Sequence, residues 1–160
     1  MTLQLAKEGA HLVHLDASKK SVDWARENAQ AAGLEKEPVR WIVDDVRKFV
    51  SKEMRRGSRY EGIILDPPSY GRGTKKEVWK IEDDLGALLS ELAQLRSDNF
   101  SFLFLTCHTP GITGLALQNL LGAIFKGEGS LHSGELALTE QKGSRKLPSG
   151  SFCLWLRGKD

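Results

Sequence analysis

A chain of 160 residues with 40% hydrophobic and 28% charged residues is long enough for one domain with a real core, and its composition is that of an ordinary globular protein. A net charge of +2 says almost nothing about partners, and two cysteines are too few for a disulfide scaffold. No apolar run approaches the ~18 residues of a transmembrane helix, and the N-terminus lacks a signal pattern. We therefore expect a cytoplasmic protein without membrane spans.

The elements follow one another in a regular order. In chain order the pattern predicts a helix over residues 3–9, a strand over 11–15, a helix over 18–33, a strand over 39–43, a helix over 46–57, a strand over 62–65, a helix over 81–95, a strand over 100–105, a helix over 113–125, and two weaker strands over 135–138 and 152–156. Strands that alternate with helices imply a parallel sheet, and two closing strands with no helix between them imply an antiparallel pair at one edge. We predict a single α/β domain over residues 1–160.

Side-chain type predicts which residues of these elements are buried. The strands at 11–15 and 62–65 read as buried, and the link between the last two strands reads as a mobile surface loop. In the helix over 46–57, the residues expected to face inward are Val46, Phe49, Val50 and Met54. The tryptophans expected to pack are Trp24, Trp41 and Trp155, and packing is also the favoured role of Trp79. Local basic clusters, including Lys142, Arg145 and Lys146, are more typical of a solvated face than of a phosphate site.

The segment Asp66-Pro67-Pro68-Ser69-Tyr70 is the most informative motif. A carboxylate at the carboxyl end of a parallel strand faces the crevice where such sheets bind ligands. Two prolines leave carbonyls as acceptors without N–H donors, and the Tyr70 ring can stack on a flat partner. These groups suit a planar ring with amino groups, such as a nucleobase. The alternative is a proline-rich turn in which Tyr70 merely packs.

Four segments in register resemble the class I S-adenosylmethionine-dependent methyltransferases, and in particular the ribosomal-RNA branch that includes the 23S rRNA cytosine-C5 enzymes. The segments are VHLDASKKSVDWARENAQAAGL, RWIVDDVRKF, YEGIILDPPSYGRG and FLFLTCHTPG. The resemblance implies a Rossmann-like sheet, mostly parallel with an antiparallel edge strand. It also implies S-adenosyl-L-methionine as cofactor and RNA, favoured to be ribosomal, as substrate.

The family begins its catalytic domain with a strand and a Gly-rich turn that hold the methionine end of the cofactor. Neither is found ahead of the helix over 3–9. We therefore expect a partial catalytic domain, truncated at its N-terminus, with weak or no activity alone. Without the missing central strand, the strands over 11–15 and 62–65 would either keep free inner edges or pair with each other.

The resemblance also assigns residues to the cofactor. Asp16, with Ala17, would hold the ribose hydroxyls, although Asp16 could instead cap the next helix. Asp45, with Val46, would meet the adenine, and Asp66 would lie beside the methyl donor. Asp44 is an equally available carboxylate, and one of this acidic pair would serve only as a helix N-cap.

The predicted catalytic residues are Asp66, Pro67, Pro68, Tyr70 and Cys107. Asp66 and the proline carbonyls would grip the target base. Cys107 would add to carbon-6 of a cytosine so that carbon-5 becomes nucleophilic; the equally weighted alternative is a small buried thiol. His108 is expected to be structural, because neighbours on a strand face opposite ways, and Cys153 is expected to lie in the core.

Three other functions stay open, of which methyl transfer to a small molecule is disfavoured by the basic loop after the Asp66 motif and by the family segments. Methylation of a guanine nitrogen would keep the fold and need no thiol. A non-catalytic RNA-binding or assembly module would keep the fold without using the cofactor. We predict no metal site, and the sequence leaves the oligomeric state undefined.

Overall fold

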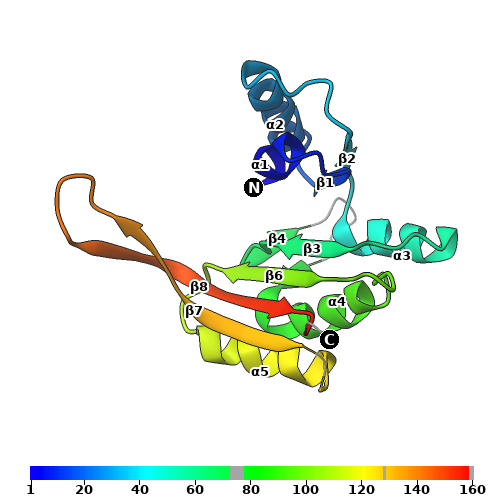
Figure 1. The fold of residues 1–160 in the computed structure, drawn as a ribbon. Helices are drawn as coiled ribbons and strands as arrows, with labels where there is room; N and C mark the ends of the chain where they lie inside the picture. Colours follow the sequence, from blue (N-terminus) through cyan, green and yellow to red (C-terminus); the bar gives the residue numbers. More distant parts are fainter. Residues whose placement is uncertain (73–77, 128, 159–160) are drawn as a thin grey trace. The chain divides into compact units, whose positions relative to one another are not determined.

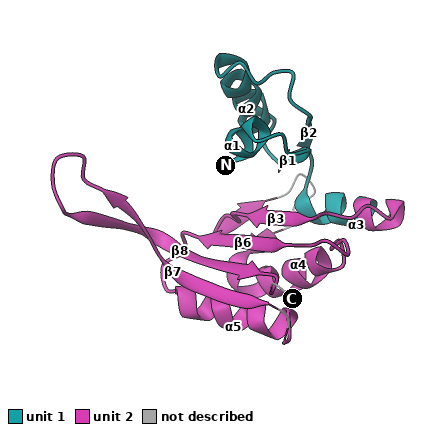
Figure 2. Cartoon of the chain, in the orientation of Figure 1, with its two compact units in different colours: residues 1–52 teal, residues 53–160 magenta. Residues whose placement is uncertain are grey.

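The computed structural model describes residues 1–72, 78–127 and 129–158. Its helices are α1 Thr2–Lys7, α2 Lys19–Ala31, α3 Val46–Arg56, α4 Ile81–Ala93 and α5 Gly114–Ile124 (Figure 1). Its strands are β1 Leu12–Asp16, β2 Val39–Val43, β3 Gly62–Leu65, β4 Tyr70–Arg72, β5 Val78–Lys80, β6 Phe102–Cys107, β7 Ser130–Thr139 and β8 Lys146–Leu156. The chain divides into two compact units, residues 1–52 and residues 53–160, with the division inside α3 (Figure 2).

Unit 1 is built around two parallel strands. β1 pairs with β2 in a register that ends with Asp16 beside Val43. The hydroxyl of Ser18 accepts a hydrogen bond from the Ser21 amide at 3.2 Å, so Ser18 caps α2. β1 was expected to be buried, but it is only half-buried along its length. It is an edge strand of a two-stranded sheet in the described part of the chain, so one side of it stays open.

Unit 2 contains a mixed sheet in the order β3-β6-β8-β7. β3 runs parallel to β6, whereas β8 runs antiparallel to both β6 and β7. The predicted α/β class, with parallel strands and an antiparallel edge, is confirmed. β3 is also an edge strand and is half-buried rather than buried. Among the described residues, β1 and β3 lie in separate sheets, which is the first of the two arrangements expected for them.

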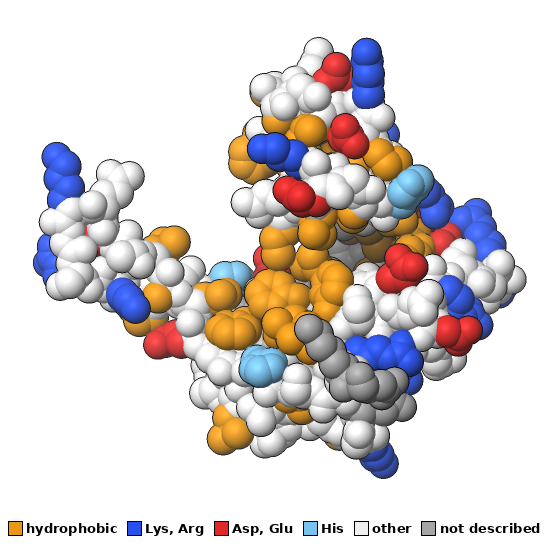
Figure 3. All heavy atoms as spheres, in the orientation of Figure 1, with side chains coloured by type: hydrophobic (Ala, Val, Ile, Leu, Met, Phe, Trp, Pro, Cys, Tyr) orange, Lys and Arg blue, Asp and Glu red, His pale blue; other side chains and the backbone are white. Residues whose placement is uncertain are grey.

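The core of unit 2 lies between this sheet and the helices α4 and α5. Alternate residues of β6 point into it: Leu103, Leu105 and Cys107 all have no exposed surface. They pack with leucines of both helices and with Trp155 of β8. The other face of the sheet carries Phe104, Phe152 and Leu154, which are only half-buried. Figure 3 shows hydrophobic side chains gathered over this sheet.

The last two strands correct one prediction. The link between them was expected to be a loop, but β7 and β8 form one long hairpin, and only residues 140–145 turn. The backbone pairing extends through Lys146, Leu147 and Pro148, because an antiparallel ladder tolerates polar residues and an edge proline where both faces meet solvent. A second short hairpin, β4 with β5, was not predicted.

Two inward-facing predictions are wrong. Met54 is 37% exposed, and its neighbour Glu53 is buried instead. The Glu53 carboxylate tolerates burial because Tyr60 donates to it at 2.6 Å and Arg56 at 2.9 Å. Trp24 was expected to pack, yet it is 67% exposed, because it lies on the solvent side of α2. Among the described residues, none of the helices is both long and apolar enough to cross a membrane.

Candidate cofactor and substrate sites

In unit 1, acidic residues stand at the carboxyl ends of the two parallel strands. Asp16 ends β1 and Asp44 follows β2, and the Asp44 amide donates to the Asp16 carbonyl at 3.2 Å. The Asp16 carboxylate accepts from the Ser18 amide at 2.7 Å through Oδ1. Its Oδ2 has no hydrogen-bond partner among the described residues. That oxygen is an acceptor at the strand end, where ligands of such sheets bind. Ala17, next along the chain, is exposed.

The carboxylates of Asp44 and Asp45 make different contacts, and these show which of the two is the helix N-cap. Asp44 Oδ1 accepts from the Asp45 amide at 2.9 Å and Oδ2 from Lys52 at 2.7 Å. The hydrogen bond from Lys52 is the main cause that lowers the pKa of Asp44. Asp45 Oδ1 accepts from the Lys48 amide at 3.1 Å, so Asp45 is the N-cap of α3. Both oxygens of Asp44 are engaged, whereas the cap bond uses one oxygen of Asp45.

In unit 2, Asp66 meets residues from the end of β6. The Thr106 hydroxyl donates to Asp66 Oδ1 at 2.6 Å, and His108 Nε2 lies 3.5 Å from the same oxygen. We call these three residues the Asp66 cluster. The Asp66 side chain is 55% exposed and that of His108 is 52% exposed, so both can reach a ligand. A hydrogen bond of 2.7 Å between the hydroxyls of Ser69 and Thr109 ties the two following loops together.

The Asp66 cluster contains two residues that the sequence analysis missed. Thr106 received no role, and His108 was expected to be structural. The register of β3 and β6 places Leu65 beside Leu105, so the next residue, Asp66, falls on the same face as Thr106 and His108. Strand alternation was the signal that could have found them.

His108 is held in one defined orientation. Its Nδ1 bonds to the carbonyl oxygen of Ser149, and a carbonyl can only accept, so Nδ1 carries the proton. In the neutral ring, Nε2 then has a free electron pair close to Asp66. The arrangement can therefore accept a proton beside an exposed carboxylate.

The remaining motif residues are held by local contacts. The Pro68 carbonyl accepts from Trp79 Nε1 at 2.7 Å, so one of the two predicted proline acceptors already has a protein donor. Pro67 is buried. Tyr70 is 49% exposed, and its hydroxyl accepts from Arg72 Nε at 2.8 Å. The Tyr70 ring can stack on a ligand, while Trp79 packs against the core and fixes the second proline.

Cys107 lies apart from the Asp66 cluster. Its side chain belongs to the buried core between the sheet and the helices, on the opposite face of β6 from Thr106 and His108. Of the two roles left open for this residue, the geometry favours the small buried thiol. Cys153 is buried beside it, as predicted, and burial raises the pKa of the Cys153 thiol to about 11. No three or more His, Cys, Asp or Glu side chains in the described ranges gather into a metal-binding group.

No protein-family model matches the chain. The solved structure of the S-adenosylmethionine-dependent methyltransferase from Agrobacterium tumefaciens superposes with a TM-score of 0.91 and 38% identity, over 97% of this chain and 51% of that one. SMU.776, solved in complex with S-adenosylhomocysteine (SAH), superposes with a TM-score of 0.75 at 20% identity, over 97% of this chain and 42% of that one. The second likeness shows the fold alone.

A curated relative is similar over a shorter stretch. Ribosomal RNA large subunit methyltransferase I of Aeromonas salmonicida is 35% identical over 65 residues, which are 40% of this chain and 16% of the relative. The chain spans about half the length of the Agrobacterium protein. These comparisons confirm the predicted resemblance to the class I S-adenosylmethionine-dependent methyltransferases.

Proposed function

We propose that the protein is an S-adenosylmethionine-dependent methyltransferase that acts on RNA, with ribosomal RNA as the favoured class. The observation that carries the proposal is the placement of acidic residues at the carboxyl ends of parallel strands within each unit: Asp16 ends β1 and Asp44 follows β2 in unit 1, and Asp66 follows β3 in unit 2. This is the edge at which open α/β sheets bind their ligands. The names of the relatives described above support the reaction and the substrate class.

The residues of unit 1 fit the adenosine part of the cofactor. Asp16 Oδ2 offers the acceptor that ribose hydroxyls need. Asp45 can accept from an exocyclic amine through its second oxygen. Val46 begins α3, and the first amides of a helix have no partner within it, so the Val46 amide can donate to a ring nitrogen. Asp44, whose oxygens are both engaged, would support Asp45. When bound, S-adenosylmethionine supplies an activated methyl group.

The residues of unit 2 would handle the target base. The Asp66 carboxylate would accept from the base's amino or ring N–H groups, and the exposed Tyr70 ring would stack on an unpaired base. A base atom that carries a hydrogen, such as carbon-5 of cytosine or an N–H nitrogen of guanine, loses a proton when it is methylated. His108 Nε2, which lies 3.5 Å from Asp66, would accept that proton. His108 thereby fills a role for which the sequence had offered no residue.

The target atom divides the proposal into two candidates. Cytosine carbon-5 is the atom that the resemblance favours, and its usual chemistry requires a thiolate at carbon-6. The burial of Cys107 on the helix side of β6 favours a reaction without that thiol, such as methylation of a guanine nitrogen. Cys107→Ala separates them: retained methyl transfer excludes the covalent route through this residue, and complete loss with an intact fold supports it. Cys153→Ala, an equally buried thiol nearby, is the matched control.

The proposal is tested first by calorimetric titration with SAH, on this chain and on a version extended upstream by the codons that precede Met1. Asp16→Asn should weaken SAH binding about 10- to 100-fold, because hydrogen bonds to a charged group contribute roughly 1.5–3 kcal/mol. Asp23→Asn removes the same charge from a half-buried position in α2, where the carboxylate pairs with Lys19, and should leave binding unchanged.

Transfer itself is measured with radiolabelled methyl donor and ribosomal RNA. SAH binding followed by label in RNA supports the proposal. Absence of SAH binding by both versions overturns it. RNA binding that SAH does not affect would then favour the non-catalytic module.

A further inference from the structure

The β7–β8 hairpin continues past the sheet as a two-stranded arm, which we define as residues 136–149. β8 pairs with β6 only from Ser151 onwards, and in the described strands the preceding part of β8 pairs with β7 alone. Figure 1 shows this arm projecting beyond the other strands of unit 2. Every residue from 137 to 148 is exposed. The arm therefore adds little to the core, and its length calls for another explanation.

The base of the arm is fixed at the Asp66 cluster. His108 Nδ1 donates to the carbonyl of Ser149, the last residue of the arm. The next residue, Gly150, has a φ of 121°, and a Cβ there would lie 2.6 Å from the Cys107 carbonyl oxygen. Only glycine allows this close approach. The arm thus leaves the sheet at the point where Asp66 faces solvent, and a polymer bound at Asp66 would pass its base.

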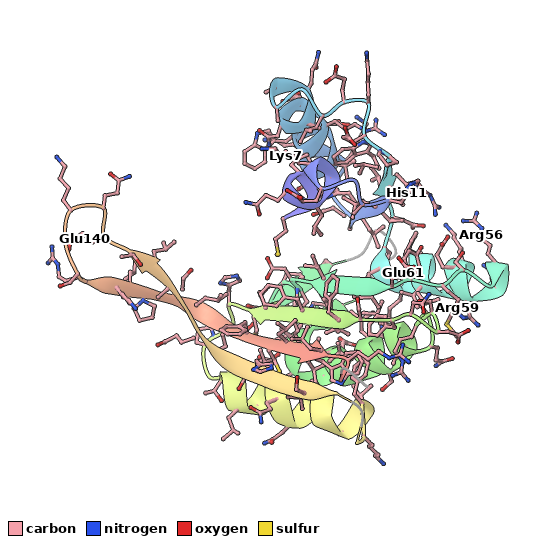
Figure 4. The ribbon with its side chains drawn as sticks, in the orientation of Figure 1. Lys7, His11, Arg56, Arg59, Glu61 and Glu140 are labelled. Carbon is pink, nitrogen blue, oxygen red and sulfur yellow. The ribbon has the colours of Figure 1, made fainter. Side chains whose placement is uncertain are left out.

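The arm is basic, although the chain as a whole is nearly neutral. It carries Lys142, Arg145 and Lys146 against the single acid Glu140, so its net charge of three minus one equals the +2 of all 160 residues. Arg145 donates to both oxygens of Glu140, at 2.6 and 3.1 Å, and this lowers the pKa of that carboxyl. Glu140 lies at the tip (Figure 4). Since Arg145 neutralises it, Lys142 and Lys146 remain available to an external anion.

An apolar pair lies one step along the arm from Lys146, on the opposite face of the hairpin. Leu138 and Leu147 are directly opposite each other in the hairpin register and are 62% and 65% exposed. Two leucines provide far less than the ~800 Å² per partner that a standard protein interface buries. They are large enough for one base or ribose to rest on. Proteins that hold single-stranded nucleic acid combine basic side chains along the backbone with side chains, usually aromatic, on which the bases rest. In the arm the two leucines would take the second role.

We infer that the arm binds the phosphate backbone of the RNA whose target base lies at the Asp66 cluster. The inference deepens the proposed function and rests on it for RNA as the substrate. Lys142 and Lys146 contact phosphates, and the Leu138–Leu147 pair supports the adjoining nucleotide. The arm contributes affinity and the direction in which the strand runs, and it does not enter the reaction.

The test is fluorescence anisotropy with a labelled, mixed-sequence single-stranded RNA, without cofactor and over a range of salt concentrations. The double variant Lys142→Ala/Lys146→Ala should bind several-fold more weakly. Its slope of log affinity against log salt should fall by about 1.4, because each phosphate contact on a single strand contributes about 0.7. Both lysines are exposed, so the thermal melting curve should not change.

Lys126→Ala is the matched control. Lys126 is exposed and precedes β7 at the end opposite the arm. Its removal should therefore lower RNA affinity much less than removal of the two arm lysines does. An equal loss in the control, or no loss in the arm variants, would overturn the inference. Dimerisation through the arm would also overturn the inference. In that case Leu138→Ala/Leu147→Ala would abolish the dimer and leave RNA binding intact.

The same variants are titrated with SAH. Arm-dependent RNA binding, with no SAH binding by either the short or the extended version, would support the role of the arm and overturn methyl transfer. If the chain binds SAH and methylates RNA and the arm variants change neither activity nor RNA binding, the proposed function is supported and the inference about the arm is overturned.

Discussion

The two faces of β6 differ in what they can do, although their residues alternate along a single strand. The odd positions, from Leu103 to Cys107, are fully buried against α4 and α5. The even positions end in Thr106 and His108, which meet Asp66 where solvent has access. Burial on one face fixes the strand, and the other face can then hold polar groups in position. The Cys107 thiol lies on the buried face, and the His108 imidazole lies on the face that solvent reaches.

The largest effect on stability is expected from a leucine-to-alanine substitution on the buried face of the sheet, compared with the same substitution on the other face. Leu105→Ala removes a fully buried side chain and should lower the free energy of unfolding by about 2–5 kcal/mol. Leu154 lies in β8 on the opposite face of the sheet and is half-buried. Leu154→Ala should therefore lower the free energy of unfolding by less, about 1–2 kcal/mol. Urea unfolding followed by the near-ultraviolet signal of unit 2 measures both. Equal costs would mean that the second face is covered as tightly as the first.

The buried Cys153 thiol should make the stability of the core sensitive to alkali. Burial raises the pKa of Cys153 from 9.0 to about 11, so the folded state keeps a proton that the unfolded state releases. Stability from this group is therefore fully present below pH 9 and falls as the pH rises from 9 towards about 11. Unfolding curves of the parent chain and of Cys153→Ala should converge over this window. A constant difference between them across the window would contradict the prediction.

A smaller effect is expected on the polar face. Thr106→Val removes the donor to Asp66 while keeping the shape of the side chain. Because Asp66 is more than half exposed, water replaces part of the lost bond, and the cost should be about 0.5–1.5 kcal/mol. Thr139→Val, at an exposed position of the hairpin, should change stability by less than about 0.5 kcal/mol. If both variants lose the same stability, the Thr106–Asp66 bond contributes nothing to the fold.

The sequence could predict which segments carry the candidate site residues but not which partners their side chains contact. Alternating strands and helices, with Asp16 and Asp66 at strand ends, follow from local pattern alone. The role of Asp45 as an N-cap depends on the geometry of the first turn of α3, and the engagement of Asp44 depends on Lys52, eight positions away. The same limit hid the long hairpin, because the pairing of Lys146 with Thr139 is a property of two strands and not of either one.

The Asp66 cluster shows this limit most clearly, and it gives the last prediction. The partners of His108 are 42 and 41 positions away in the chain, at Asp66 and Ser149, so no local pattern announces them. If the Ser149 carbonyl fixes the ring, nitrogen-15 spectra of the neutral His108 should show the proton on Nδ1. His132, whose Nε2 bonds to a serine hydroxyl that can donate or accept, serves as the internal reference because nothing fixes its tautomer. A proton on Nε2 of neutral His108 would break the contrast between the two faces, because the ring would then donate to Asp66 and could not take a proton from a substrate.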